Sequence, residues 1–350
     1  MELKEEMYNL IKVGLYVFIS LAYCYFVGKL VPKGVLRFLT ILPVVVLYLF
    51  IPLSLTSVHM IGAFSFYMSW LANFKLMLFA FEKGPLSSPS VTLLRFFAVA
   101  CFPIDATQYT KEFSKPDNPK KTSLLTYGAK GIVLAFCLRI YHNHNEDLHP
   151  MVTWCIFGII LYFSLELIVA LSSTIVGLFL DVELDQQFDE PYLATSLQDF
   201  WGRRWNVMVN RILHPSVYEP TRILSVKVVG RLWAPVPAIL ATFLVSGLMH
   251  ELIFFYFTKD WPTWDVMYFF GLHGVCLVLE VVIKKATRYK WSLPNNLSRL
   301  LVVVFVLATS YWLFLPELLR CKMVESAIEE YAVVSDLAMD VVRSPPIFFN

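Results

Sequence analysis

The chain has 350 residues, of which 57% are hydrophobic and 16% are charged, and its formal net charge at pH 7 is +2. Soluble domains are about 45 to 50% apolar and about 25% charged, so this composition excludes an ordinary soluble domain and indicates a membrane protein. The small net charge indicates no nucleic-acid partner. The six cysteines form no CxxC pair, which predicts neither a disulfide framework nor a zinc site.

Long apolar runs follow one another along most of the chain. A helix needs roughly 20 apolar residues to cross a bilayer core of about 30 Å. Runs of that length, bounded by charge, proline or glycine, predict eight spans: 8–28, 36–55, 58–81, 124–141, 151–180, 233–258, 266–283 and 297–317. The shorter run 91–104 indicates a re-entrant or interfacial piece. We therefore expect an all-α, polytopic integral membrane protein with about eight transmembrane helices plus interfacial amphipathic helices.

Lysines and arginines gather in three loops between these spans, 29–37, 111–121 and 284–299. Basic loops stay on the cytoplasmic side, and all three lie on one face if both termini are lumenal. The same scheme places the long polar connection 181–232 on the cytoplasmic side. We expect a single domain over residues 1–350, with a tail from 321 to 350 that forms a short surface helix followed by a loose end.

The polar connection contains the motif PYLATSLQDFWGRRWNVMVNRILHPSVY at 191–218. Its apolar residues recur at helical spacing, which predicts an amphipathic helix with a capping box that starts at Thr195 or Ser196. A plain interfacial anchor, with its tryptophans at the headgroup level, is the structural alternative. The guanidinium groups of Arg203 and Arg204 could contact either lipid phosphates or the phosphates of a soluble cofactor.

His250 is embedded in the apolar run VPAILATFLVSGLMHELIFFYF, directly before Glu251. Ionisable residues at membrane depth are costly and usually functional, and a neutral imidazole is a natural general base near physiological pH. Glu251 lies about 100° round the helix from His250, so it can pair with another span instead. A metalloprotease HExxH site is excluded because Phe254 stands where the second histidine is required.

Other ionisable residues within the apolar runs favour structural roles. Lys75, Glu166 and His273 are expected to form interhelical hydrogen bonds or ion pairs. Three histidines lie in a short polar turn: His142, His144 and His149. Solvated loop histidines are the default interpretation of that turn, and a metal site is the minor alternative.

Four motifs resemble the plant wax synthase-like branch of the membrane-bound O-acyltransferases. They are PYLATSLQDFWGRRWN, VSGLMHE, WLANFKLMLFAFEKGPLS at 70–87 and LHGVCLVLEVVIKK at 272–285, so the resemblance covers nearly the whole chain. It implies transfer of an acyl group from coenzyme A to a hydroxyl, with His250 as the catalytic histidine and Asn206 as the second family residue. Asp199 and Trp205 are then supporting neighbours of Asn206, and Glu251 is a supporting residue beside His250.

The resemblance also implies a mechanism. His250 accepts the proton of the attacking hydroxyl, and Asn206 donates to the developing oxyanion or orients the histidine. Acyl-CoA is a co-substrate, no further cofactor is expected, and its charged head would lie near Arg203, Arg204 and Arg211. The acceptor is a lipophilic alcohol, foremost a long-chain fatty alcohol that gives a wax ester, and the protein is expected in the endoplasmic reticulum membrane.

Two groups of alternatives stay open. The acceptor could be a sterol or a diacylglycerol, including a variant that uses acetyl-CoA, or the protein could be a lipid carrier or channel that does not react. The depth of His250 is a difficulty, because it lies about 26 Å into a span that starts at Trp233, beyond the midplane. Either the span starts later, the helix tilts, or the loop helix reaches inward.

Overall fold

The computed structural model describes residues 3–88, 91–103, 124–144, 148–180, 186–287 and 293–343. Within these ranges every regular element is helical. In chain order the α-helices are α1 (Leu3–Leu30), α2 (Val35–Phe50), α3 (Val58–Phe64), α4 (Asn73–Ala80), α5 (Leu93–Cys101), α7 (Leu124–His144), α8 (Pro150–Leu180), α9 (Leu197–Asp199), α10 (Val207–Leu213), α11 (Glu219–Trp233), α12 (Pro235–Thr258), α13 (Asp265–Ala286), α14 (Asn295–Leu313), α15 (Leu315–Arg320) and α16 (Met323–Arg343). Shorter helical pieces are η1 (Ile51–Ser54), η2 (Ser65–Ala72), η3 (Pro85–Ser87), η5 (Pro191–Leu193), η6 (Phe200–Arg204) and η7 (His214–Tyr218).

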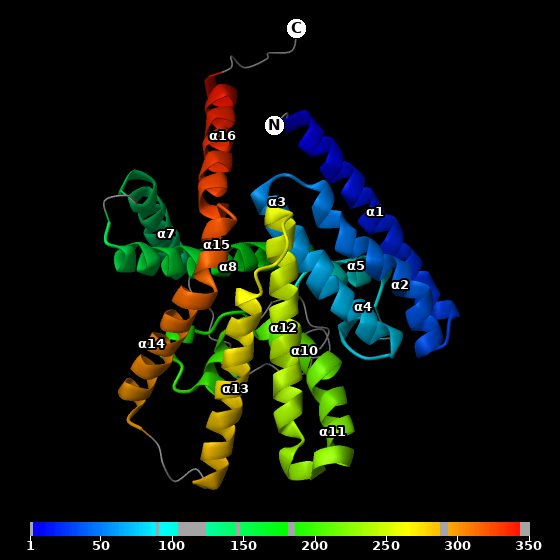
Figure 1. Ribbon diagram of the computed structural model, residues 1–350. Helices are drawn as coiled ribbons and strands as arrows, with labels where there is room; N and C mark the ends of the chain where they lie inside the picture. The colour runs from blue at the N-terminus through cyan, green and yellow to red at the C-terminus, as the bar shows by residue number, and fades with distance from the viewer. Residues whose placement is uncertain are drawn as a thin grey trace.

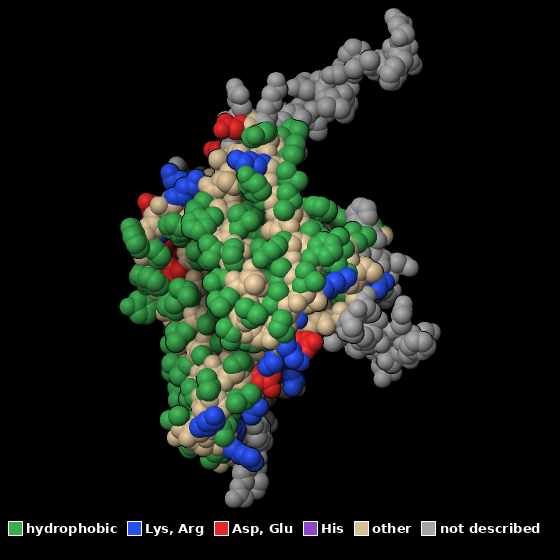
Figure 2. All heavy atoms as spheres, turned by 90° about the vertical axis from the view of Figure 1, so that its right-hand side faces the viewer, with side chains coloured by type: hydrophobic (Ala, Val, Ile, Leu, Met, Phe, Trp, Pro, Cys, Tyr) green, Lys and Arg blue, Asp and Glu red, His purple; other side chains and the backbone are tan. Residues whose placement is uncertain are grey.

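Seven helices in the described part of the chain are long and apolar enough to cross a membrane: α1, α2, α7, α8, α12, α13 and α14. They confirm seven of the eight predicted spans. No more than 39% of the most apolar stretch of each is buried, so much of their surface is left for lipid. Figure 2 agrees, because hydrophobic side chains spread over most of the face that it presents.

The expected span 58–81 differs from the other seven. It is helical, but α3 gives way to the π-helix η2, which then continues as α4. Nearly every residue of η2 and α4 is buried, so this stretch lies inside the helical bundle and does not face lipid. Apolar composition could not distinguish the two cases, because a helix that is hydrophobic all round is suited equally to a protein interior and to a bilayer.

The two ends of the described chain lie on the same side of the bundle. In Figure 1 the start of α1 and the end of α16 are both at the top, whereas the end of α13 and the start of α14 are at the bottom. The helix ends that flank the basic loop 284–299 are thus far from the start of α1 and the end of α16, as the charge pattern predicts. The basic loop 111–121 lies outside the described residues.

Two carboxylates from opposite ends of the chain bind the amino-terminal turn of α3. The Glu6 carboxylate of α1 accepts hydrogen bonds from the Thr56 hydroxyl at 2.6 Å and from the Ser57 backbone N–H at 3.0 Å. The Glu330 carboxylate of α16 accepts from the Val58 backbone N–H at 2.6 Å and from the Ser57 hydroxyl at 2.9 Å. Negative groups are favourable there because the first N–H groups of a helix have no intrahelical partner. The helix predicted within 321–350 is therefore α16, and its Glu330 side chain anchors the start of α3.

We expect Glu330→Gln to destabilise the folded protein by about 1 to 2 kcal/mol at pH 7, because hydrogen bonds to a charged acceptor are lost. Burial alone raises the pKa of Glu330, but hydrogen bonds from the His59 ring, Val58 and Ser57 outweigh it and hold that pKa below its ordinary value of 4.5. A lowered folded-state pKa stabilises above the unfolded-state pKa, and this contribution is lost as pH falls through the folded-state value. Thermal unfolding in detergent at pH 7 and near pH 3 measures the difference.

The matched control is Glu329→Gln, since Glu329 is the exposed neighbour on the same helix. It should leave the unfolding temperature unchanged at both pH values. The electrostatic explanation predicts that wild type and Glu330→Gln differ less in unfolding temperature near pH 3 than at pH 7. An equally large difference at both pH values would contradict it.

Helices α12 and α13 form a closely packed antiparallel pair. A Cβ atom added to Gly247 of α12 would lie 2.9 Å from the Met267 sulfur, and one added to Gly274 of α13 would lie 3.0 Å from the Phe243 Cβ. Small residues at such contacts let helix backbones approach closely. The Glu251 carboxylate joins the same pair, because its Oε1 accepts from the Met267 backbone N–H at 2.9 Å.

The single amphipathic helix predicted over 191–218 is wrong. The helix α9–η6 ends at Trp205, and α10 begins after Asn206, whose φ of 42° lies in the left-handed region. Asparagine tolerates that conformation better than most residues, and its Oδ1 accepts from the Val209 N–H at 3.5 Å as an N-cap. Helical spacing continues across the break, so periodicity alone could not reveal it.

The capping box is confirmed at Ser196. Its Oγ accepts a hydrogen bond from the Asp199 backbone N–H at 3.0 Å, and the Asp199 Oδ2 accepts one from the Thr195 N–H at 3.2 Å. These reciprocal bonds fix the point at which α9 begins.

Candidate active site

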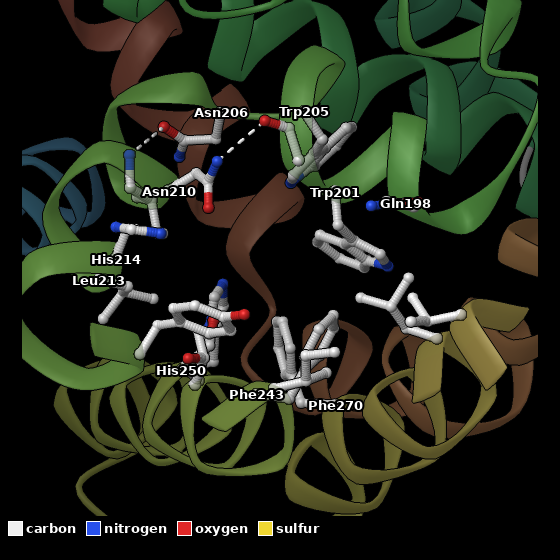
Figure 3. Close-up of a pocket in the computed structure, with 18 of the residues that line it drawn as sticks. Gln198, Trp201, Trp205, Asn206, Asn210, Leu213, His214, Phe243, His250 and Phe270 are labelled. Atoms are coloured by element: carbon white, nitrogen blue, oxygen red, sulfur yellow. Dashed lines mark hydrogen bonds between the residues drawn. The ribbon is translucent and has the colours of Figure 1, made fainter. Parts of the chain in front are cut away.

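A cavity of about 320 Å³ lies between α12 and α13 on one side and the segment 198–218 on the other. Figure 3 shows His250, Phe243 and Phe270 on the lower wall and Asn206, Asn210 and His214 on the upper wall. Trp201 and Trp205 also line it. The structure thus brings His250 together with the neighbouring residues Trp205 and Asn206, which lie far from it in the sequence.

The hydrogen bonding of His250 defines which ring nitrogen can act as a base. Its Nδ1 lies 2.7 Å from the backbone carbonyl oxygen of Ser246. A carbonyl oxygen can only accept, so Nδ1 carries the hydrogen and Nε2 carries the lone pair. Nε2 forms no hydrogen bond with any described residue. In its neutral form, His250 is therefore held in the tautomer whose basic nitrogen, Nε2, is left for a ligand.

Aromatic rings hold the imidazole of His250 in place from two sides. The Trp70 ring meets it edge-on with centroids 5.0 Å apart, and the Phe270 ring lies at 4.4 Å. Trp70 belongs to η2, so the buried stretch 58–80 reaches the site directly. An apolar enclosure of this kind strengthens electrostatic interactions with a bound substrate.

Two carboxamides line the wall opposite His250. Because the Asn206 Oδ1 caps α10, its Nδ2 amide remains without a hydrogen-bond acceptor among the described residues. The Asn210 Nδ2 donates to the Gly202 carbonyl at 2.8 Å, and its Oδ1 faces the open centre of the cavity in Figure 3. Sequence reasoning missed Asn210 as a site residue. Its position, four residues after Asn206 on a helical pattern, was the available signal.

The predicted supporting residues stabilise the segment that carries Asn206 and do not contact its amide. Asp199 accepts from the Arg204 Nε at 2.9 Å, and the Arg204 Nη1 donates to the Asp189 carbonyl at 3.0 Å. Trp205 stacks on Phe200 with centroids 5.5 Å apart and ring planes 15° apart. Trp201 and Trp205 line the cavity, so they have a role beyond that of the interfacial anchor that was the alternative.

The three predicted arginines are not in the cavity. Arg204 is bound to Asp199, whereas Arg203 and Arg211 are exposed on the outer side of the segment. Glu251 is 1% exposed, and its Oε1 is bound to α13. It forms no hydrogen bond with His250, so the expectation that it would pair with another span is confirmed.

The ionisable residues that were assigned structural roles have them. The Lys75 Nζ donates to the backbone carbonyls of Val99 and Phe102, both at 2.6 Å. Glu166 forms an ion pair with Lys130 of α7. His273, on α13, forms one hydrogen bond to Trp201 and another to α14.

The prediction for the turn histidines falls partly on residues that are not described, since 145–147 lie outside the described ranges. Elsewhere, the described residues contain no group of three or more side chains placed to bind a metal.

A multi-pass bundle of apolar helices with a histidine and two carboxamides in one cavity is typical of an integral membrane enzyme. The chain belongs to the membrane-bound O-acyltransferase family. The profile of the "Membrane bound O-acyl transferase family" matches residues 184–272, a range that contains both Asn206 and His250.

Full-length relatives support the same assignment. The chain is 42% identical to Acyl-CoA--sterol O-acyltransferase 1 of Arabidopsis thaliana, over 96% of this chain and 98% of the relative. It is also 42% identical to the Long-chain-alcohol O-fatty-acyltransferase of Simmondsia chinensis, over 95% of this chain and 96% of the relative. Probable long-chain-alcohol O-fatty-acyltransferase 3 of Arabidopsis thaliana is 41% identical over 95% of this chain.

Proposed function

We propose that this protein transfers a fatty acyl group from acyl-CoA to the hydroxyl of a long-chain alcohol and so forms a wax ester. The observation that carries the proposal is the hydrogen bond from His250 to the Ser246 carbonyl, which leaves Nε2 available in the cavity that Asn206 also lines. Acyl-CoA is the co-substrate, and the chemistry needs no bound cofactor. The proposed location is the endoplasmic reticulum membrane, where such substrates dissolve.

The proposed reaction uses two side chains that line the cavity, His250 and Asn206. The alcohol oxygen attacks the thioester carbonyl carbon while His250 Nε2 accepts the hydroxyl proton. A C–O bond forms, and the carbonyl electrons move onto the oxygen, where the Asn206 Nδ2 amide stabilises the negative charge. The intermediate then breaks its C–S bond, and the imidazolium returns the proton to the departing thiolate. The products are the ester and free coenzyme A.

The assignment of Asn206 to the oxyanion depends on its free donor. Two roles were open from the sequence: donation to the oxyanion or orientation of the histidine. The Ser246 carbonyl already orients the imidazole, and no hydrogen bond joins Asn206 to His250. A substrate between the two walls is therefore the natural acceptor for the Asn206 amide.

The shape of the cavity supports entry of acyl-CoA from the basic end of α13. The lining extends from His250 back to Ile239 on α12 and from Phe270 forward to Val281 on α13. Each interval covers about 16 Å of helix. The cavity thus extends from His250 towards Lys284 and the basic loop that the charge pattern places in the cytoplasm. The proposed contact of the coenzyme A head with Arg203 and Arg211 lies outside the cavity, and Arg204 is already committed to Asp199.

This arrangement also accounts for the depth of His250. Helix α12 begins at Pro235, so His250 still lies about 22 Å along it. The segment 198–218 lines the same cavity as His250, so it reaches inward to the histidine and brings Asn206 with it. The shared cavity supports the third of the explanations left open by the sequence, in which the loop segment reaches inward.

A sterol acceptor is the second candidate, because a relative named as a sterol acyltransferase is as similar as one named for long-chain alcohols. The test is an assay of microsomes that contain the protein, with radiolabelled palmitoyl-CoA and a panel of fatty alcohol, sterol and diacylglycerol. We expect wax ester as the main product. A main product of steryl ester or triacylglycerol would reassign the acceptor, and no transfer to any acceptor would contradict the proposed reaction.

A further inference from the structure

A chain of hydrogen bonds through three elements holds Trp201 in the cavity wall. The Trp201 indole N–H donates to the His273 Nδ1 at 3.1 Å, and the His273 Nε2 lies 2.8 Å from the Thr309 hydroxyl. Because an indole nitrogen can only donate, Nδ1 must accept and Nε2 must carry the hydrogen. The Thr309 hydroxyl in turn donates to the Phe305 carbonyl at 2.8 Å. The chain is satisfied only when His273 is neutral and in this tautomer.

His273 lies behind the cavity and not in it. It is fully buried, with 0% of its surface exposed, whereas Trp201 lines the cavity. A buried imidazole without partners would be costly, so both of its nitrogens must remain bonded. Trp201 therefore cannot turn away from its present position without leaving the Nδ1 of His273 unpaired.

The position of Trp201 affects the rings that surround His250. The Trp201 ring packs against Phe243 at 5.6 Å and against Phe270 at 5.8 Å, and the Phe270 ring lies 4.4 Å from His250. These rings form the middle of the cavity, between the proposed entry of acyl-CoA and the histidine. A displaced indole would change the width of that passage.

Helix α13 provides a second anchor for the same segment. Glu280 lies seven residues after His273, two turns along the helix, and so on the same face. Its carboxylate accepts from the Leu197 backbone N–H at 2.7 Å and from the Gln198 N–H at 3.3 Å, at the start of α9. One helix face thus holds both the start of the segment and its first tryptophan.

We propose that His273 is a positioning residue that, through Trp201, sets the width of the passage along which acyl-CoA reaches His250. This inference rests on the proposed acyl-transfer function. Loss of the hydrogen bond between Trp201 and His273 releases the indole from the cavity wall, so acyl-CoA binds less tightly. The groups that do the chemistry, His250 and Asn206, keep their own hydrogen bonds to Ser246 and Val209. The KM for acyl-CoA should therefore change more than kcat.

The test compares His273→Leu, His273→Gln and Trp201→Phe in the full-length protein in detergent micelles, with palmitoyl-CoA and stearyl alcohol. Leucine removes both hydrogen bonds, whereas the glutamine amide can accept from Trp201 and donate to Thr309. Phenylalanine at 201 keeps one aromatic ring but removes the N–H donor and part of the indole, so it remains informative if His273→Leu does not fold. We expect His273→Leu and Trp201→Phe to raise the KM for palmitoyl-CoA about tenfold, the effect of one hydrogen bond. We expect kcat to change less than about threefold and His273→Gln to restore most of the affinity.

His59→Leu is the matched control, because it also removes a histidine hydrogen bond, that to Glu330, but away from the cavity. It should lower the unfolding temperature without changing the KM for palmitoyl-CoA. The inference is overturned if His273→Leu and Trp201→Phe keep the wild-type KM for palmitoyl-CoA, or lose kcat alone. It is also overturned if His273→Gln behaves like His273→Leu. Absence of transfer by the wild type would instead contradict the proposed function.

Discussion

His250→Ala is expected to lower the rate of acyl transfer by about 10²- to 10⁴-fold, the contribution typical of a positioned general base. The reason is that the Nε2 of His250 has no hydrogen-bonding partner among the described residues and can accept a proton, whereas Nδ1 donates to the Ser246 carbonyl. The variant should still insert into membranes and elute as a single species, because His250 makes no other hydrogen bond within the described structure. The measurement is ester formation by purified wild type and variant at saturating acyl-CoA.

The same variant separates an enzyme from a lipid carrier or channel. A carrier needs the cavity but no base, so His250→Ala would leave its binding and transport of lipid largely intact. An enzyme keeps binding and loses turnover. His59→Ala serves as a control for the loss of a histidine, since His59 is bonded to Glu330 and is not part of the cavity. Full activity of His250→Ala would remove His250 from the mechanism.

Asn206→Asp is expected to lower kcat by about 10²- to 10³-fold, the cost typical of removing one oxyanion donor. Aspartate keeps an oxygen for the Val209 N–H and tolerates a positive φ, so α10 retains its cap. It lacks the amide hydrogens that the proposed mechanism directs at the oxyanion. The variant thus removes the donor while it preserves the backbone break at residue 206.

Asn206→Gly provides the complementary comparison, because glycine accepts the φ of 42° but removes both the cap and the donor. We expect it to lose as much kcat as Asn206→Asp and, in addition, some thermal stability. If Asn206→Asp retained full kcat, Asn206 would act only as a helix cap. The oxyanion would then require another donor in the cavity.

The transmembrane helices were predictable because length and apolarity determine which helices can span a bilayer. The same criterion was insufficient for 58–81, where the Lys75 Nζ binds two backbone carbonyls and Trp70 packs on His250. Burial against protein and burial in lipid require the same composition. Only the contacts between helices distinguish them.

The site was predictable in part. An ionisable side chain in an apolar run indicated His250, and the resemblance to known acyltransferases indicated Asn206. Only the resemblance implied that the two residues meet; helical spacing could not predict it, because it depends on the break at residue 206 and on the inward position of the loop segment. The sequence pattern also did not indicate that Ser246 fixes the tautomer of His250, since a backbone carbonyl has no residue-specific signal.

The most direct test of the central claim is a cryo-electron microscopy structure of the protein with a non-reactive thioether analogue of palmitoyl-CoA. We predict that the analogue's carbon next to sulfur lies between His250 and Asn206, with room for an attacking oxygen about 3 to 3.5 Å from that carbon and within hydrogen-bond reach of Nε2. The coenzyme A head should lie at the end of α13 that carries Lys284. A complex in which the sulfur binds away from this cavity, or in which Nε2 of His250 is bonded to protein, would contradict the account.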